Sequence, residues 1–442
     1  MGCQTRRMRI KPWREARKQW LWVIFGTVVV TFTAVLLVMN FTIGEKNIER
    51  RIERLYTLDD PRFAYELGVL LGPAFTSGNK VQDLQNGDRI FPAMLGAIRS
   101  AQVSINFETY IYWSGDIGKE FADTLSERSR AGVKVHVLLD WVGSTKIDDD
   151  YLRTMKLAGV RIEKFPPPHW SNLGRLNNRT HRKLLLVDGR VAFTGGVGIA
   201  PQWTGNAQSS EHWRDSHYQV EGPVVAQMQS AFLDNWIRVT GDVLLGPAYF
   251  AAQPPQPAGP SAAQMFSSSP SGGSESMALM YLMSITAASR TIDLSAAYFV
   301  PDKMTSEALV AAMKRGVRLR IVVPGEHIDS ETVRKASRAL WGNLLAAGAV
   351  IAEYQPTMYH CKVMIVDGLL VSVGSTNFDN RSFRLNDEAT LNVLDAAFAK
   401  EQTAVFEADL AKARRITHAE WLQRPRTERL IEYAASLIGA QL

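Results

Sequence analysis

Hydrophobic positions first form one long run near the N-terminus. Residues 20–39 contain no charged side chain, and a helix of about twenty such residues spans the roughly 30 Å hydrocarbon core of a bilayer. The run exceeds the apolar region of a cleavable signal, and no Ala-x-Ala-like site follows it. The pattern predicts an uncleaved transmembrane anchor over residues 20–40, between a basic tail (1–19) and a juxtamembrane segment (41–85).

After residue 86 the pattern alternates between short β-type runs and amphipathic helical runs, and it does so twice. In the first copy we expect helices at residues 90–100, 118–131 and 151–158, with strands at 103–112, 133–140 and 160–165. In the second copy we expect helices at 280–288, 305–315 and 332–347, with strands at 292–298, 317–323 and 350–354. This alternation predicts an α/β fold of two similar lobes, each a mixed β-sheet flanked by helices.

The composition of the intervening segments sets the expected boundaries. Residues 253–273 are rich in Pro, Ser, Gly and Ala, which is typical of a linker between a first lobe (86–252) and a second lobe (274–442). The first copy carries about ten extra residues within 166–180. Residues 396–442 are predicted to form amphipathic C-terminal helices, and we expect the tail at 430–442 to pack on the lobe rather than touch lipid.

Each copy contains the same polar motif, H-x-K-x4-D. Its residues are His181, Lys183 and Asp188 in the first copy and His360, Lys362 and Asp367 in the second. In both copies an apolar run and an Asp-Gly pair predict a strand, a tight turn and a second strand. A period of two places the histidine and the lysine on one face of the first strand, where both can address one anion. The two aspartates are turn residues, so we expect them to fix the hairpin rather than touch substrate.

A Gly-Gly pair in the first copy and a Gly-Ser pair in the second lie at the same distance after the motif aspartates. The predicted phosphate-binding residues are Gly195, Gly196, Ser375 and Asn377. Gly198 stands at the first-copy position that corresponds to Asn377, so one side-chain contact is missing there, and backbone amides are the expected substitute.

The paired motifs resemble those of the phospholipase D superfamily, and further segments resemble the bacterial cardiolipin synthases within it. These segments are NFETYIY (106–112), WRD (213–215), EGPVV (221–225), YFVPD (298–302) and GSTNFDNRSFRLNDE (374–388). The resemblance runs from about residue 86 to the C-terminus. It implies a single active site between the lobes. It also implies transfer of a phosphatidyl group from one phosphatidylglycerol to another through a phosphohistidine intermediate, with release of glycerol.

The residue types suit this chemistry. Cleavage of a phosphodiester needs a nucleophile, a proton for the leaving oxygen and positive charge near the phosphate, which two histidines and two lysines supply without a metal or cofactor. The resemblance implies that His181 is the nucleophile and His360 the general acid and then base, although the symmetry of the motifs leaves the reverse assignment open. A nucleophilic imidazole also needs a carboxylate on its other nitrogen. The candidates are Asp215, 34 residues after His181, and Glu388, 28 residues after His360.

Other residues are candidates for the surroundings of the site. Arg381, Ser382 and Asn386 follow the second motif and are expected at a polar rim. Trp113, Trp170 and Trp203 lie on predicted loops, where they could face acyl chains, although burial is the commoner fate of tryptophan.

Charge and cysteine usage narrow the function and the location. The net charge of +6 resides in residues 1–19, so the remainder is neutral, which disfavours nucleic acid as a partner. The basic tail predicts a cytoplasmic N-terminus and an extracytoplasmic catalytic region in a bacterial inner membrane. Cys3 and Cys361 are expected on opposite sides of that membrane, and Cys361 is expected to point into the core. The partners expected are the membrane and a phospholipid, whereas the sequence does not indicate an oligomeric state.

Three alternatives remain open at this stage. A phospholipase D would hand the phosphatidyl group to water, and the sequence does not show how well the pocket excludes water. A nuclease of the same superfamily is disfavoured by the neutral catalytic region. A lipid-binding protein without catalysis is disfavoured by the two intact His/Lys pairs, and Gly198 is the one residue in its favour.

Overall fold

The computed structural model describes residues 12–41, 48, 50–165, 177–250, 256–269 and 276–437. Trp170, most of the extra segment 166–180, both ends of the expected linker and the chain ends lie outside these ranges. Helix α1 (Pro12–Phe41) belongs to a unit separate from the two lobes. Its stretch Arg17–Val38 is long and apolar enough to cross a membrane, in agreement with the predicted anchor.

The first helix after α1 in the chain is α2 (Pro61–Leu71), and the first lobe follows. Its strands are β1 (Thr76–Gln85), β2 (Ser104–Thr109), β3 (Lys134–Asp140), β4 (Arg161–Phe165), β5 (Arg179–Thr180), β6 (Leu184–Val187), β7 (Val191–Gly195) and β8 (Ser216–Glu221). Its helices are α3 (Gly87–Ser100), α4 (Asp116–Arg130), α5 (Asp149–Leu157), the short η2 (Pro201–Trp203) and α6 (Val224–Thr240).

The second lobe repeats this order and adds elements at its end. Its strands are β9 (Ser261–Ser268), β10 (Thr291–Ala296), β11 (Phe299–Val300), β12 (Arg318–Pro324), β13 (Val350–Tyr354), β14 (Lys362–Val366), β15 (Leu370–Gly374), β16 (Phe378–Asp379), β17 (Asn386–Leu394) and β18 (Ala413–Ile416). Its helices are α7 (Ser276–Ala287), α8 (Lys303–Lys314), α9 (Glu331–Ala346), α10 (Asn380–Arg384), α11 (Ala396–Leu410), α12 (His418–Leu422) and α13 (Arg426–Leu437).

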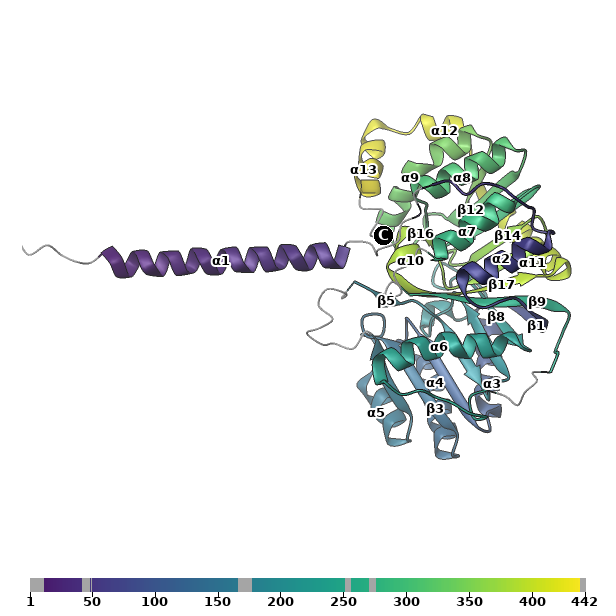
Figure 1. Cartoon of the computed structure of the whole chain (residues 1–442), viewed down its shortest axis with the longest axis horizontal. Helices are drawn as coiled ribbons and strands as arrows, with labels where there is room; N and C mark the ends of the chain where they lie inside the picture. The colour runs from purple at the N-terminus through teal and green to yellow at the C-terminus, as the bar shows by residue number, and fades with distance from the viewer. Residues whose placement is uncertain are drawn as a thin grey trace, which may run out of the picture. The chain divides into compact units, whose positions relative to one another are not determined.

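The two lobes share one mixed sheet. In each lobe three parallel strands continue into antiparallel ones, β4-β3-β2-β6-β7-β8-β1 in the first and β13-β12-β10-β14-β15-β17-β9 in the second. The first strand of each lobe, β1 or β9, pairs antiparallel with the other at the middle of the sheet. Figure 1 shows the first lobe (blue to teal) below the second (green to yellow). The predicted α/β class with two similar lobes is therefore confirmed.

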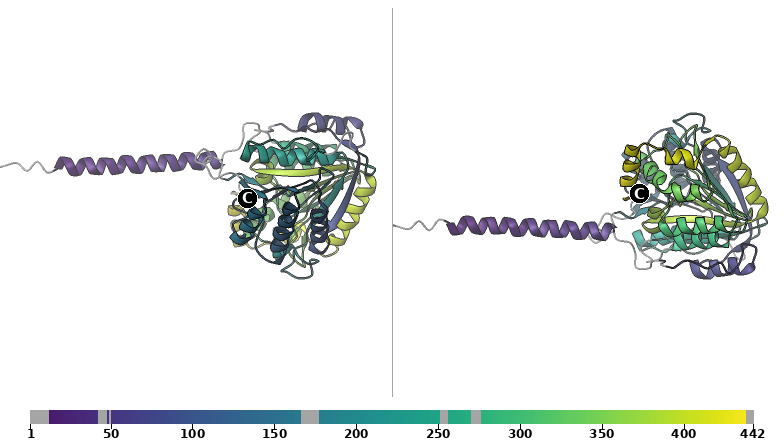
Figure 2. Two further views of the ribbon diagram at one scale, coloured as in Figure 1. Left: turned by 90° about the horizontal axis from the view of Figure 1, so that it is seen from below. Right: turned by 90° about the horizontal axis from the view of Figure 1, so that it is seen from above.

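Alternating side chains of the motif strands divide the core. Leu184 and Leu186 face a cluster that includes α6 and α11 residues of both lobes, whereas Leu185 and Val187 face α3 and α4. Cys361 is buried in the shared cluster, as predicted. Helices cover both faces of the sheet (Figure 2). The lobes are thus joined by a continuous core as well as by strand pairing, which holds their motifs in a fixed relation.

Two segments differ from the expectation. The range 253–273, predicted to be a linker, contains β9, which is the central strand between β17 and β1. Six of the eight residues of β9 are Ser, Ala or Gln, Met265 and Phe266 are its large apolar residues, and none is β-branched. Propensity therefore did not indicate a strand, and burial between two neighbouring strands overrides that preference. Likewise β1 and α2 lie within the expected juxtamembrane segment, so the ordered lobe begins before residue 86.

Candidate active site

The two motif histidines line one small hollow between the lobes. It has a volume of about 140 Å³, and both His181 and His360 border it together with Lys183. The other residues around it are Tyr110, Ile111, Arg179, Trp203, Trp213, Tyr298, Asp329, Asn377, Asp379, Arg381 and Asn386. The structure therefore brings the two halves of the repeat together at a single place.

Each histidine backbone is held by the opposite lobe. The His181 amide donates to the carbonyl of Asp387, at 2.9 Å, and the His360 amide donates to the carbonyl of Arg214, at 2.8 Å. These acceptors are the residues directly before Glu388 and Asp215. The two hairpins are therefore locked into the partner lobe at the residue next to each candidate carboxylate.

The carboxylates are exchanged between the lobes. His181 Nδ1 lies 3.0 Å from both oxygens of Glu388, and His360 Nδ1 lies 2.7 Å from Asp215 Oδ2. The spacing in the sequence had placed Asp215 after His181 and Glu388 after His360, so the partner that each histidine contacts is the opposite of the one its own copy offers. Because a carboxylate only accepts, each Nδ1 carries the proton and leaves Nε2 with its lone pair toward the hollow.

Further donors hold both carboxylates in place. Glu388 accepts from the Ser375 hydroxyl at 2.5 Å. Asp215 accepts from the Trp203 indole at 2.9 Å and from the Ser216 amide at 2.8 Å. Both carboxylates are fully buried. Their orientation is therefore determined before any substrate binds.

The motif aspartates are away from the chemistry. Asp188 and Asp367 both have φ of +53° and are followed by glycines with positive φ, which is the geometry of a tight hairpin turn. The Asp188 carboxylate accepts from the amides of residues 102, 103 and 104, and Asp367 accepts from those of residues 289, 290 and 291. Each aspartate fastens its hairpin to the start of the neighbouring strand, β2 or β10.

The four residues predicted to bind phosphate do not share one environment. Asn377 borders the hollow, whereas Ser375 is fully buried and its hydroxyl is used by Glu388. A Cβ on Gly196 would lie 2.3 Å from Asp215 Oδ1, and one on Gly195 would lie 2.6 Å from the His217 backbone. Gly195 and Gly196 therefore leave space for β8 and for the Asp215 carboxylate just before it. Of the four residues, only Asn377 has a side chain that borders the hollow and can contact a phosphate there.

Gly198 has a steric explanation. A Cβ at this position would lie 2.9 Å from the Ile111 side chain and 3.1 Å from the Trp203 ring. The Trp203 indole packs edge-on against the His360 ring, with 5.4 Å between centroids. Trp203 thus occupies the space that an asparagine at residue 198 would need, and its buried ring supports His360 and Asp215.

Burial dominates the electrostatics of the hollow. Burial, with the charge of nearby Lys183, lowers the pKa of His181 to about 4 against the opposing effect of Glu388. Burial also lowers the pKa of Lys183 to about 7. The pKa of His360 and that of Lys362 are lowered by burial as well. At neutral pH both imidazoles are therefore uncharged, which suits a nucleophile and a base.

The carboxylates remain ionised. Burial, the largest single effect, pushes their pKa values up, but the adjacent imidazole, the nearby lysine and the hydrogen-bond donors together outweigh it, so the pKa of Glu388 and that of Asp215 are both lowered. Lys183 Nζ donates to the His181 carbonyl at 2.8 Å, and Lys362 Nζ lies 3.2 Å from the His360 ring nitrogens. Each lysine Nζ is thus fixed beside its histidine, where a bound phosphate oxygen would favour the charged form and complete its hydrogen bonds.

Several lining residues were not predicted as site residues. The Tyr110 ring lies edge-on to His181, with 5.3 Å between centroids, and the Tyr298 hydroxyl donates to Asp329 at 2.8 Å. Tyr110, Tyr298 and Asp329 all follow the carboxyl ends of parallel strands, β2, β10 and β12. Ligands commonly bind at such ends in α/β sheets, so this position was the available signal.

Of the residues expected at the polar rim, Arg381 and Asn386 border the hollow. The Ser382 hydroxyl instead accepts from the backbone N–H of Asn377. Trp113 donates to the Gly143 carbonyl at 2.8 Å. Within the described ranges, no group of three or more His, Cys, Asp or Glu residues is arranged to hold a metal ion.

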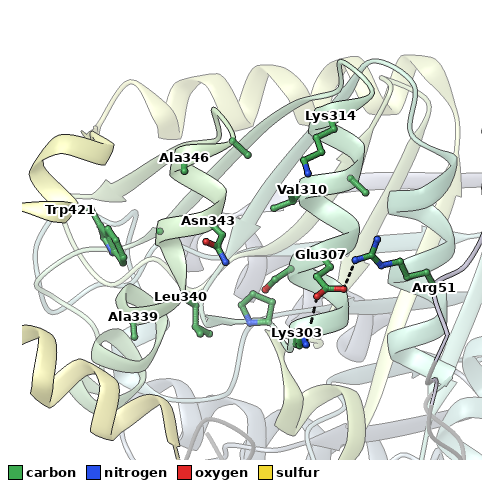
Figure 3. Close-up of a pocket in the computed structure, with 15 residues that line it drawn as sticks. Arg51, Lys303, Glu307, Val310, Lys314, Ala339, Leu340, Asn343, Ala346 and Trp421 are labelled. Carbon is green, nitrogen blue, oxygen red and sulfur yellow. Dashed lines mark hydrogen bonds and ion pairs between the residues drawn. The ribbon is translucent and has the colours of Figure 1, made fainter.

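A larger hollow lies elsewhere on the second lobe. It has a volume of about 870 Å³ and lies between α8 and α9, with Trp421 at one side (Figure 3). The described residues that line it include no histidine or cysteine, and the Glu307 carboxylate is engaged by Arg51 at 2.8 Å. Its Ser306 hydroxyl has no histidine among the lining residues to act as a base, so the smaller hollow is the candidate active site.

Comparison with known proteins agrees with this geometry. The family model described as "Cardiolipin synthase, PLD-like domain" matches residues 94–236 and 281–410. Cardiolipin synthase A of Pseudomonas fluorescens (strain Pf-5) is 34% identical over 367 residues, 82% of this chain and 75% of that protein. A cardiolipin synthase of Geobacillus sp. (strain WCH70) is 34% identical over 398 residues, 89% of this chain and 79% of that protein.

A solved structure shares the fold. The crystal structure of phosphatidylserine synthase from Haemophilus influenzae Rd KW20 superposes with a TM-score of 0.65, at 13% identity, covering 86% of this chain and all of that one. The family match covers both lobes and more than half of the chain. The protein therefore belongs to the phospholipase D-like family of cardiolipin synthases.

Proposed function

We propose that this enzyme transfers a phosphatidyl group from one phosphatidylglycerol to a hydroxyl of a second, producing cardiolipin and glycerol. The observation that carries the proposal is the pair of imidazoles in one hollow, each oriented by a carboxylate of the other lobe. The names of the relatives, cardiolipin synthases, support the choice of substrate. No nucleic acid partner is expected, because the chain beyond residue 19 carries no net charge.

In the first step His181 Nε2 attacks phosphorus and the bond to the glycerol oxygen breaks. Glu388 stabilises the positive charge that develops on the imidazole, because its carboxylate lies on Nδ1. His360 gives a proton to the leaving glycerol oxygen. The negative phosphodiester raises the pKa of His360 as it binds, so the imidazole takes up the proton that it then gives to the leaving oxygen.

In the second step a hydroxyl of the second phosphatidylglycerol attacks the phosphohistidine. His360, now neutral, accepts the proton of this hydroxyl, and the phosphorus–nitrogen bond breaks. Atoms balance, since two phosphatidylglycerol molecules give one cardiolipin and one glycerol. Lys183, Lys362 and Asn377 are the proposed partners of the phosphate oxygens in both steps.

The proposed location is a bacterial inner membrane. The relatives are bacterial and α1 is suited to anchor the chain in a membrane. We propose a cytoplasmic N-terminus and an extracytoplasmic catalytic region, from the basic residues before the anchor. Labelling of Cys3 by an impermeant maleimide in intact cells would show that the N-terminus is extracytoplasmic and would contradict this proposal. Labelling only after lysis would support a cytoplasmic N-terminus.

The test of the reaction uses phosphatidylglycerol vesicles labelled in the terminal glycerol, with a chelator present. Cardiolipin and free glycerol in equal amounts are expected. Phosphatidic acid with glycerol but no cardiolipin would identify a hydrolase instead. His181→Ala and His360→Ala should each abolish turnover while the melting temperature stays close to that of the wild type, and near-normal activity in either variant would end the shared-site proposal.

A further inference from the structure

Helix α13 is attached to the second lobe by its charged side. Arg338 of α9 lies 2.8 Å from Glu428 and 3.4 Å from Glu432, and Arg424 pairs with Glu432 as well. Glu432 is only 1% exposed. A surface helix normally turns its apolar side to the protein and its charged side to water. The orientation of α13 is the reverse.

The outward side of α13 is correspondingly apolar. Arg426, Leu430, Tyr433 and Leu437 follow one another at i, i+4, i+7 and i+11, which places them along one stripe of the helix. Leu430 is 69% exposed, Tyr433 60% and Leu437 68%. Three large apolar side chains in one stripe, held outward by ion pairs behind them, indicate a surface that is covered by an apolar partner.

Charge identifies the kind of partner. Arg426 and Arg429 are exposed beside the apolar stripe, and neither takes part in an ion pair within the part of the chain that the structure describes. Apolar side chains next to unpaired arginines match the headgroup region of a bilayer that contains anionic lipid.

The stripe is also close to the catalytic hollow. Ala435, on the inner side of α13, packs with Val300 and Tyr298 in one small apolar cluster, and Tyr298 borders the hollow. We propose that the outer stripe of α13, formed by Arg426, Leu430, Tyr433 and Leu437, lies in the headgroup region of an anionic bilayer and directs the nearby hollow toward lipid. This docking goes beyond the transfer reaction and does not depend on it.

Helix α2 provides a comparison on the same catalytic region. It exposes Tyr65, Val69 and Leu70 to a similar degree. In and just before this helix, Asp59, Asp60 and Glu66 outnumber Arg62, which is paired with Asp60. The helix lies on the other side of the catalytic region from α13 in Figures 1 and 2. A flat bilayer cannot contact both helices at once, so α2 is a matched control.

The experiment uses the full chain in nanodiscs and a fluorescent label at Ala434, beside the stripe. Cys3→Ser and Ala434→Cys provide a single reactive thiol, since Cys361 is buried and its pKa is raised to about 12 by that burial. The bilayers contain phosphatidylcholine with or without phosphatidylserine, which is anionic without being the proposed substrate. Quenching by a nitroxide on the acyl chain reports whether the label lies at lipid depth.

We expect quenching in the anionic bilayer and its loss in L430S/Y433S/L437S, whereas Y65S/V69S/L70S leaves it unchanged. Arg426→Gln and Arg429→Gln should each lower the ratio of docked to undocked helix about five-fold, the effect of one charge near an anionic surface. An unquenched label in the wild type would overturn the proposal. So would loss of quenching in the α2 variant alone.

Energy transfer between labels on two α13 helices, rising with protein concentration, would overturn it in favour of a second copy as the partner. The quenching does not require turnover. A failure of the proposed docking is therefore distinguishable from a failure of the proposed reaction.

Discussion

Replacement of Glu388 by glutamine tests how the lobes cooperate in the proposed reaction. The carboxylate is fully buried, and both of its oxygens lie 3.0 Å from His181 Nδ1. Glutamine has nearly the same shape, so the substitution removes the negative charge with little change in packing. The glutamine side-chain amide also allows the His181 imidazole to adopt the other tautomer, in which Nε2 carries the proton. A protonated Nε2 has no free lone pair and cannot attack phosphorus.

The distance gives the size of the effect. Attack by His181 on phosphorus puts a positive charge on the imidazole, and the carboxylate stabilises this charge in the transition state. Coulomb's law, at an effective dielectric constant of about 20 and 3.0 Å separation, gives about 5.5 kcal/mol. Each 1.36 kcal/mol corresponds to about a factor of ten in rate, so turnover should fall by about four powers of ten.

The assay measures cardiolipin formed from phosphatidylglycerol in nanodiscs. Glu401→Gln is the control, because this residue is an exposed glutamate on the same lobe and should leave turnover unchanged. The melting temperature of Glu388→Gln should stay within a few degrees of the wild type, which separates catalysis from folding. A folded Glu388→Gln protein that retains a tenth of wild-type turnover would refute the exchange of carboxylates as a catalytic requirement.

Three further predictions follow from single contacts. Gly198→Asn should destabilise the fold by about 1–3 kcal/mol, because the side chain overlaps Trp203, and should lower the melting temperature instead of restoring a phosphate contact. Trp203→Phe removes the indole donor to Asp215 and should lower kcat about ten-fold, with KM nearly unchanged. His136→Phe tests pH dependence: burial lowers the pKa of His136 to about 4, so the wild type loses stability as pH falls from about 6.5 toward 4. The variant lacks this loss of stability. The difference between its melting temperature and that of the wild type should therefore increase in favour of the variant from pH 7 to pH 5, and a difference that does not change with pH would contradict the prediction.

Local patterns in the sequence were sufficient for the repeated hairpins and for the His/Lys face. A motif with Asp-Gly between apolar runs specifies a tight turn through positive φ, and both turns have that geometry. The role expected of Asp188 and Asp367 in the turns agrees with the three amides that each accepts. Such features depend on residues that are close together in the chain.

Contacts between distant segments could not be inferred in the same way. The expected pairing of Asp215 with the first motif followed sequence distance, whereas the observed pairing follows the antiparallel arrangement of the lobes across β1 and β9. That arrangement was hidden because most residues of β9 are Ser, Ala or Gln, which do not predict a strand. Because β9 was not predicted as the central strand, the sequence did not indicate that each histidine would contact the carboxylate of the other lobe.

Both halves of the site contain a histidine paired with a carboxylate, but the aromatic residues around the two histidines differ. His360 packs against the adjoining rings of Trp203 and Trp213, both 5.4 Å from it and 4.7 Å from each other, whereas His181 contacts one ring among the described residues, that of Tyr110. A nucleophile must approach phosphorus closely, while an acid and base needs only to reach an oxygen of the leaving or entering group. In the proposed reaction His360, which has two aromatic neighbours, therefore suits the proton transfers and His181 the attack; the two histidines are equally buried. Gly198 belongs to the same asymmetry, because the space it leaves is what allows Trp203 to pack against His360.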